Sequence, residues 1–236
     1  MDAGTTSPYI MTVAKKQFVQ AHYLCDVNKL TGVKMDNCTS IMKERFTSLL
    51  LSTGRKGMDS VLSRLEETGF FTAPASTRFH LNRKGGLLEH SLNVYDSAVA
   101  LRSHVVRIRP ELEEQLPLDS VAIAALLHDT CKADIYVPAI VSEKNAAGYW
   151  EKVPGYQVDY SGMPLGHGEK SVIMLLKWGL EMTDDEILAI RWHMTAWDLA
   201  FQSPEQKESL RIAREKTPLC SLIQCGDSIS TGLLER

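Results

Sequence analysis

The most constraining feature of the sequence is a short apolar run, Val121–Leu127, that ends directly at His128 and Asp129. A helix that is apolar all round must be buried on nearly every side, so this run predicts a helix in the core. Burying an imidazole next to a carboxylate costs several kcal/mol unless both groups are paired or bound to a metal. The sequence therefore predicts that a partner or a metal ion compensates His128 and Asp129.

Further potential metal ligands lie beside apolar residues in segments with helical spacing. They are His90, His167, His193 and Asp227. Each of these residues alone is explained most simply as a buried or capping side chain. Together with His128 and Asp129, however, they make six potential ligands on or at the ends of predicted helices, which matches the way metal sites are built in the core of helical bundles. His22 and His104 fall outside this pattern, and we interpret them as surface or packing residues.

Hydrophobic periodicity predicts a mostly helical chain with one small β excursion. The predicted helices are 12–30, 40–51, 58–67, 86–105, 121–127, 167–180, 184–199, 205–215 and 218–231. The segment 135–160 is rich in Val, Tyr and Trp and has a turn at Asn145–Gly148, which indicates a β-hairpin or flap. Most of its aromatic residues are expected to pack on the helices, with at most one of them stacking on a nucleobase.

Two local strings carry a resemblance to a known family. The string Gly85–Ser91, which contains His90, and the string Leu126–Lys132, which contains His128 and Asp129, are similar to the signature helices of the HD-domain metal-dependent phosphohydrolases. The loop Phe70–Ser76 before them resembles the HD-type 3′–5′ exoribonucleases and their uncharacterised relatives. The oligonucleotide-binding domain of those exoribonucleases has no recognisable counterpart here, so a polynucleotide substrate is not favoured.

The resemblance implies a metal site and its ligands. The first metal would bind to His90, His128, Asp129 and Asp227. His167 and His193 would hold a second metal, bridged by Asp129, and Met194 stands where some cyclic-dinucleotide phosphodiesterases of this family have another histidine. A shell of imidazoles and carboxylates suits Mn, Fe, Co, Ni or Zn better than Ca, with one or two ions bound.

Several basic residues are candidates for contacts with a phosphate. Lys132 comes four residues after His128, which on one helix would place both on the same face. Arg78 and Arg83 precede the His90 helix, and Lys170 follows His167. Asp129 and Lys132 are the predicted catalytic residues. Glu89 is a candidate acceptor for the ring N–H of His90.

These observations favour a phosphohydrolase or phosphodiesterase that acts on a small nucleotide-like phosphoester through metal-activated water. A few HD-fold proteins with the same order of ligands are di-iron oxygenases that cleave C–C or C–P bonds, and this is the alternative. A third hypothesis is a sensor that binds the ligand without turning it over.

Composition adds limits to these hypotheses. The formal net charge of −3 argues against a broad basic surface for nucleic acid. Five cysteines without a CxxC pair indicate free thiols in a reducing compartment, and no signal peptide or membrane-spanning run is evident, so we expect a cytoplasmic protein. We expect residues 1–69 to form helices that pack on an HD domain of residues 70–236. The oligomeric state is not predicted.

Overall fold

The computed structural model describes residues 35–195 and 203–235. By its internal contacts the chain divides into two units, Met1–Arg45 and Phe46–Arg236. The helix that spans this division is α2 (Met35–Ser52). The candidate site lies entirely in the second unit, which is described below.

The second unit is mostly helical with one two-stranded antiparallel sheet, as the sequence predicts. Its α-helices are α3 (Met58–Glu67), α4 (Gly86–Ile108), α5 (Leu118–Leu127), α6 (Lys132–Ile135), α7 (His167–Lys177), α8 (Asp184–Trp192), α9 (Pro204–Lys216) and α10 (Pro218–Ile229). Short 3₁₀ turns occupy Phe70–Thr72 and Pro110–Leu112, and a π-helical turn, Ser230–Leu234, follows α10.

The core forms around α5. Every residue of this helix from Ser120 to Leu127 is buried, and the helix contacts α4, α8 and α10. A helix without a polar face is stable only when other helices cover it on all sides. His128, the first residue of the candidate site after α5, therefore directly follows the most buried helix of this unit.

Three aromatic rings join residues 46–69 to this core. The ring centroids of Phe46, Phe70 and Phe71 lie 5.3–5.6 Å apart, in tilted and edge-to-face arrangements that aromatic pairs favour. Helix α3 ends as predicted at Thr68 and Gly69: Thr68 caps it, and Gly69 adopts the left-handed conformation with φ = 76°.

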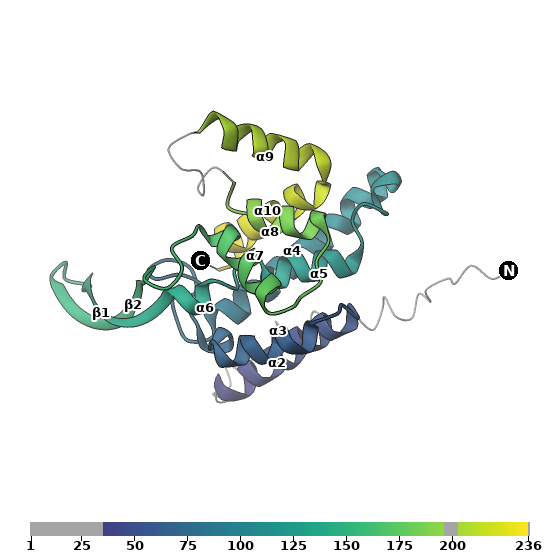
Figure 1. Cartoon of the computed structure of the whole chain (residues 1–236). Helices are drawn as coiled ribbons and strands as arrows, with labels where there is room; N and C mark the ends of the chain where they lie inside the picture. Colours follow the sequence, from purple (N-terminus) through teal and green to yellow (C-terminus); the bar gives the residue numbers. More distant parts are fainter. Residues whose placement is uncertain (1–34, 196–202, 236) are drawn as a thin grey trace. The chain divides into compact units, whose positions relative to one another are not determined.

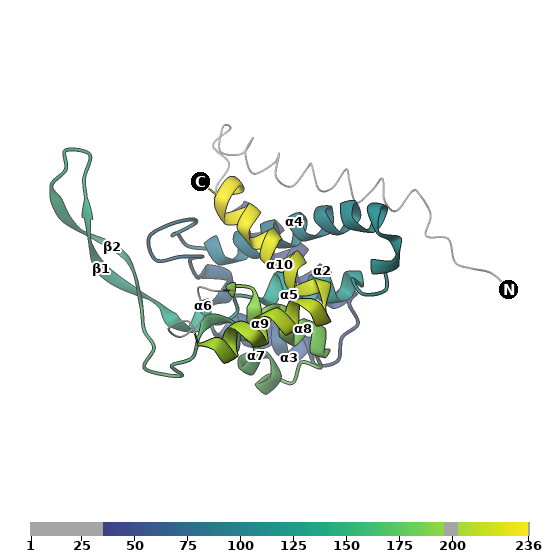
Figure 2. The ribbon, with the colours of Figure 1, turned by 90° about the horizontal axis from the view of Figure 1, so that it is seen from above.

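The β excursion is a hairpin of β1 (Tyr136–Lys144) and β2 (Trp150–Val158), paired from Tyr136↔Val158 to Lys144↔Trp150. Both views show it extending away from the helices (Figures 1 and 2). Tyr149 and Trp150 are 73% and 68% exposed. The expectation that the aromatic residues pack on the helices is therefore wrong for these two.

Several predicted boundaries differ from the structure. Helix α5 begins at Leu118, earlier than predicted, and ends at Leu127 as predicted. The chain then turns through residues 128–131 before α6 begins at Lys132. Helix α8 ends at Trp192, and the predicted continuation over 196–199 lies outside the described residues, as does the predicted helix 12–30. Thr183 begins α8 with a capping box, in which its side chain and that of Glu186 each bind the other's backbone N–H.

Two further expectations concern thiols and membranes. Cys131, Cys220 and Cys225 are free, but Cys38 is disulfide-bonded, so the expectation that all cysteines are free thiols is wrong for Cys38.

Among the described residues, no helix has the length and apolarity that crossing a bilayer requires.

Candidate metal centre

Three side chains from two separate parts of the sequence place their polar atoms together in the core. His90 Nε2, in the second turn of α4, lies 3.2 Å from His128 Nε2 and 3.3 Å from Asp129 Oδ2. His128 Nε2 and Asp129 Oδ2 are 3.1 Å apart. Asp227 of α10 extends the group, with Oδ1 3.5 Å from His90 Nε2. His90, His128 and Asp129 are buried, so these side chains could hold a metal ion out of contact with bulk water.

The other ring nitrogens of the histidines are held by acceptors. His128 Nδ1 donates to the carbonyl oxygen of Ala125 at 2.8 Å, and His193 Nδ1 donates to that of Ile190 at 2.7 Å. His90 Nδ1 lies 3.1 Å from both carboxylate oxygens of Glu235. In a neutral imidazole with its proton on Nδ1, the Nε2 lone pair is free to bind a metal.

The short distance between His90 Nε2 and His128 Nε2 is itself evidence for a cation. Two neutral rings with protons on Nδ1 would direct their Nε2 lone pairs at each other, which is repulsive and forms no hydrogen bond. A proton or a metal ion removes this conflict. Without a metal, burial opposes protonation of His90, but hydrogen bonds to Asp129 and Glu235 outweigh burial and raise the pKa of His90 to about 9. The donor set of two imidazole nitrogens and a carboxylate oxygen, buried together, also fits a bound metal ion.

Asp129 has a second oxygen that faces another histidine. Asp129 Oδ1 and His193 Nε2 are buried, lie 3.4 Å apart, and form no hydrogen bond with any described residue. The His193 ring also packs edge-on against His128, with 4.8 Å between centroids. Asp129 thus turns one oxygen to His90 and His128 and the other to His193, which is the arrangement of a bridging carboxylate.

The sixth predicted ligand, His167, begins the helix next to α8. It is the first residue of α7, but none of the contacts above includes it. Of the six predicted ligands, the structure brings together His90, His128, Asp129, His193 and Asp227.

Lys132 is buried next to the centre, with Nζ 2.5 Å from Asp129 Oδ2. Burial lowers the pKa of Lys132, but the Asp129 carboxylate more than compensates, so the net shift is upward and the ammonium stays charged. Burial in turn raises the pKa of Asp129, and Lys132 and His128 overcome this and hold it well below its usual range. His128 and Lys132 do not lie on one helix, because the turn at residues 128–131 separates α5 from α6, but both side chains reach Asp129 Oδ2.

The other predicted phosphate contacts lie in different surroundings. Lys170 is 1% exposed and forms an ion pair with Asp134. Arg83 forms an ion pair with Glu89. Glu89 was the predicted acceptor for the ring N–H of His90, but Glu235 takes that role. Arg78 is exposed in the loop before α4.

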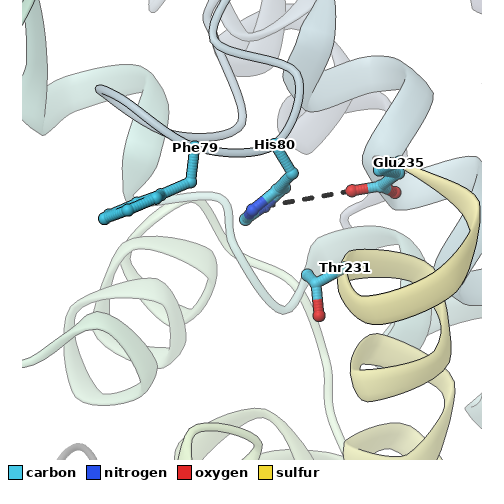
Figure 3. Close-up of a pocket in the computed structure, with 4 residues that line it drawn as sticks. All are labelled: Phe79, His80, Thr231 and Glu235. Atoms are coloured by element: carbon cyan, nitrogen blue, oxygen red, sulfur yellow. Dashed lines mark ion pairs between the residues drawn. The ribbon is translucent and has the colours of Figure 1, made fainter.

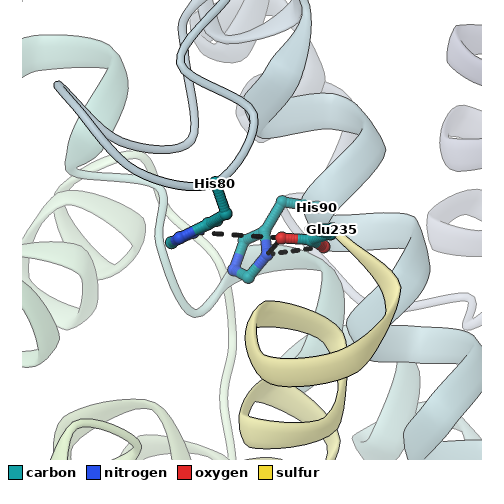
Figure 4. Close-up of side chains that lie close together, drawn as sticks. All are labelled: His80, His90 and Glu235. Carbon is teal, nitrogen blue, oxygen red and sulfur yellow. Dashed lines mark hydrogen bonds and ion pairs between the residues drawn. The ribbon is translucent and has the colours of Figure 1, made fainter.

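Two residues of the site were not predicted from the sequence. Figure 3 shows that His80, from the loop before α4, faces Glu235 after the π-helical turn, with 3.9 Å between Nε2 and Oε2. Figure 4 adds His90, whose ring lies 5.2 Å from that of His80. Glu235 also accepts a hydrogen bond from Asn93 Nδ2 at 3.0 Å. Burial and the positive charges of His90 and Lys132 lower the pKa of His80 to about 4, so this ring is neutral near pH 7.

The chain matches no family model, no curated protein and no solved structure with which it was compared. The description of the site therefore depends on its own geometry.

Proposed function

We propose that the chain is a metal-dependent phosphohydrolase or phosphodiesterase that acts on a nucleotide-like phosphoester, with a helical bundle of the HD-domain type. Its metal ligands are His90, His128, Asp129 and Asp227. The observation that carries the proposal is the buried cluster of His90, His128 and Asp129, whose Nε2 and Oδ2 atoms lie 3.1–3.3 Å from one another, because one metal ion could bind all three donor atoms.

The chemistry of the ligands limits the metal. Imidazole and carboxylate groups together suit Mn, Fe, Co, Ni or Zn. His193, next to the free oxygen of Asp129, supports a second ion that Asp129 would bridge. His167, the first residue of α7, is the other ligand that we propose for this second ion.

Each residue of the centre has a role in this reaction. A bound divalent metal supplies an activated water nucleophile and a positive charge beside the phosphoryl oxygens. Asp129 holds the ligand histidines and Lys132 in one charge network, and orients the attacking water. The Lys132 ammonium, fixed by Asp129, stabilises the negative charge that develops on the phosphoryl oxygens. Glu235 fixes the ring of His90 through Nδ1.

The test is a substrate screen with metal analysis of the same preparations. The metal-free chain is reconstituted with each of the five metals, and phosphate release from a panel of nucleotides and phosphodiesters is measured together with oxygen uptake. We expect metal-dependent hydrolysis that Asp129→Ala abolishes. Two bound irons with oxygen consumption and no hydrolysis would contradict the proposal and support the di-iron oxygenase. Metal and ligand binding without turnover would support the sensor.

A further inference from the structure

A pocket of about 320 Å³ lies beside the candidate metal centre. Phe79 and His80 line it from the loop before α4, and Thr231 and Glu235 line it from the C-terminal helical turn (Figure 3). Small-molecule sites begin at about this volume. The pocket is separate from the metal ligands, and no role in the proposed reaction has been given to it above.

The pocket and the metal centre share one carboxylate. Glu235 lines the pocket and also accepts from His90 Nδ1, 3.1 Å away, while His90 Nε2 faces the metal centre. A single imidazole ring therefore lies between the two sites. The pocket is therefore next to the metal centre, with the ring of His90 between them.

The loop that forms the pocket is fixed. Ser76 Oγ accepts from the Phe79 N–H and donates to the His80 carbonyl oxygen, both at 2.8 Å. Leu81 adopts φ = 46°, a backbone conformation that side chains other than glycine rarely take, and its carbonyl oxygen accepts from the Ala75 N–H. Strained residues of this kind cluster where the structure holds a ligand site in place.

The polar atoms that line the pocket are rich in acceptors. The Glu235 carboxylate only accepts, and it has lone pairs beyond those that bind His90 Nδ1 and Asn93 Nδ2. The Thr231 hydroxyl donates its proton to the Asp227 carbonyl oxygen, which leaves its own lone pairs free. His80 Nε2 is buried, forms no hydrogen bond with a described residue, and is 3.9 Å from Glu235. A ligand that fits this lining presents N–H donors.

The remaining side chain is aromatic. Phe79 is 82% exposed, so its ring offers an open face for stacking at the edge of the pocket. Stacking on an exposed ring is the common way in which proteins hold a nucleobase. We infer that this pocket binds the base of the substrate, specifically an amino-bearing base such as adenine, stacked on Phe79 with its N–H groups directed at Thr231 and Glu235. This inference rests on the proposed function, because it names the base of the nucleotide whose phosphate lies at the metal centre.

Equilibrium binding to the Mn²⁺-loaded full chain tests the inference. The probes are adenosine and the 5′-phosphonate analogues of adenosine, inosine and ribose, in which a methylene group replaces the bridging oxygen and prevents hydrolysis. We expect the adenosine phosphonate to bind at least about tenfold more tightly than the ribose phosphonate, as stacking predicts. It should also bind about threefold or more tightly than the inosine phosphonate, which lacks the amino donor.

Variants of Phe79 test whether its ring is responsible for the preference for the adenosine phosphonate. Phe79→Ala should abolish the preference for adenosine phosphonate over ribose phosphonate while leaving the affinity for ribose phosphonate unchanged, and Phe79→Tyr should retain the preference. Tyr149→Ala, which removes an exposed aromatic ring from the tip of the hairpin, is the matched control and should change nothing. Since Phe79 is exposed, its truncation leaves the core intact.

The outcomes separate this inference from the proposed function. Equal affinities for adenosine and ribose phosphonates, or a preference that survives Phe79→Ala, would overturn the base pocket and leave the proposed function standing. Equal affinities for adenosine and inosine phosphonates would overturn the assignment of an amino-bearing base. Phe79-dependent binding of adenosine without any binding of ribose phosphonate would support the pocket and contradict the proposed function. No binding of any probe would overturn both.

Discussion

At the scale of single residues, the centre depends on charge compensation around Asp129. Three histidine rings and an ammonium surround one carboxylate that is almost fully buried. The free energy cost of burying a charge is high unless close partners offset it. Lys132 is the permanently charged partner in this group. Since it is not a proposed metal ligand, replacing it tests its role in catalysis separately from metal binding.

Lys132→Met should leave metal binding intact but lower kcat by about 10²–10³, because an interaction that stabilises charge mainly in the transition state is worth this much. Methionine preserves most of the aliphatic length of the side chain in its buried site. The measurement is steady-state kinetics on the best substrate of the screen, with metal content determined in the same samples. Lys177→Met, on the exposed end of α7, is the control. Full activity in Lys132→Met would remove the role given to this residue.

Glu235 should act on the metal through His90. Glu235→Gln keeps an oxygen that can accept from His90 Nδ1 but removes the negative charge, and such changes next to a ligand typically weaken metal affinity by 10–100-fold. Calorimetric titration of the metal-free protein measures this change. Glu181→Gln, at an exposed position, should bind metal like the wild type. An unchanged metal affinity in Glu235→Gln would show that Glu235 does not support the centre.

At the scale of elements, close backbone approach sets the position of His193. Gly168 in α7 faces the carbonyl oxygens at the end of α8, and a Cβ atom there would lie 2.2 Å from the Arg191 oxygen. His193 follows α8 directly. Gly168 therefore allows α7 and α8 to pack closely enough to hold His193 beside Asp129.

Gly168→Ala should lower the melting temperature by several degrees, since overpacking of this kind costs about 1–3 kcal/mol. It should also weaken any second metal more than the first, because the first site uses other elements. Thermal denaturation and metal titration measure both effects. Gly162→Ala provides the matched control, since a Cβ at that position has open space around it. Equal melting temperatures for the two variants would contradict this role of Gly168.

The sequence predicted the elements of the site better than their ends. Periodicity located α3, α7, α10 and the hairpin, because each of them has one apolar face or a clear alternation. It predicted the end of α5 at Leu127 but treated Lys132 as lying on one helix with His128, since His128 and Asp129 are compatible with a continuing helix. Lys132 follows the turn at residues 128–131 and forms an ion pair with Asp129, a contact that the spacing between His128 and Lys132 did not predict.

At the scale of the whole molecule, the ligands of the centre come from residues 90 to 227, so only the folded bundle brings them together. Selecting histidines with apolar helical neighbours identified His90, His128 and His193. The same criterion passed over His80, which lies in a loop, and Glu235, whose position depends on the π-helical turn after α10. Contacts made by irregular segments have no periodic signal, so the pocket beside the centre could not be predicted.

Metal stoichiometry is the most direct test of the central claim that His90, His128, Asp129 and Asp227 form a metal centre. The full chain is stripped with a chelator, titrated with Mn²⁺ or Zn²⁺, and analysed for bound metal beside Asp129→Ala and the exposed control Asp59→Asn. We predict one or two ions per chain in the wild type and the control, and none in Asp129→Ala. A wild-type chain that binds no metal, or an Asp129→Ala variant that binds as much as the wild type, would contradict the account.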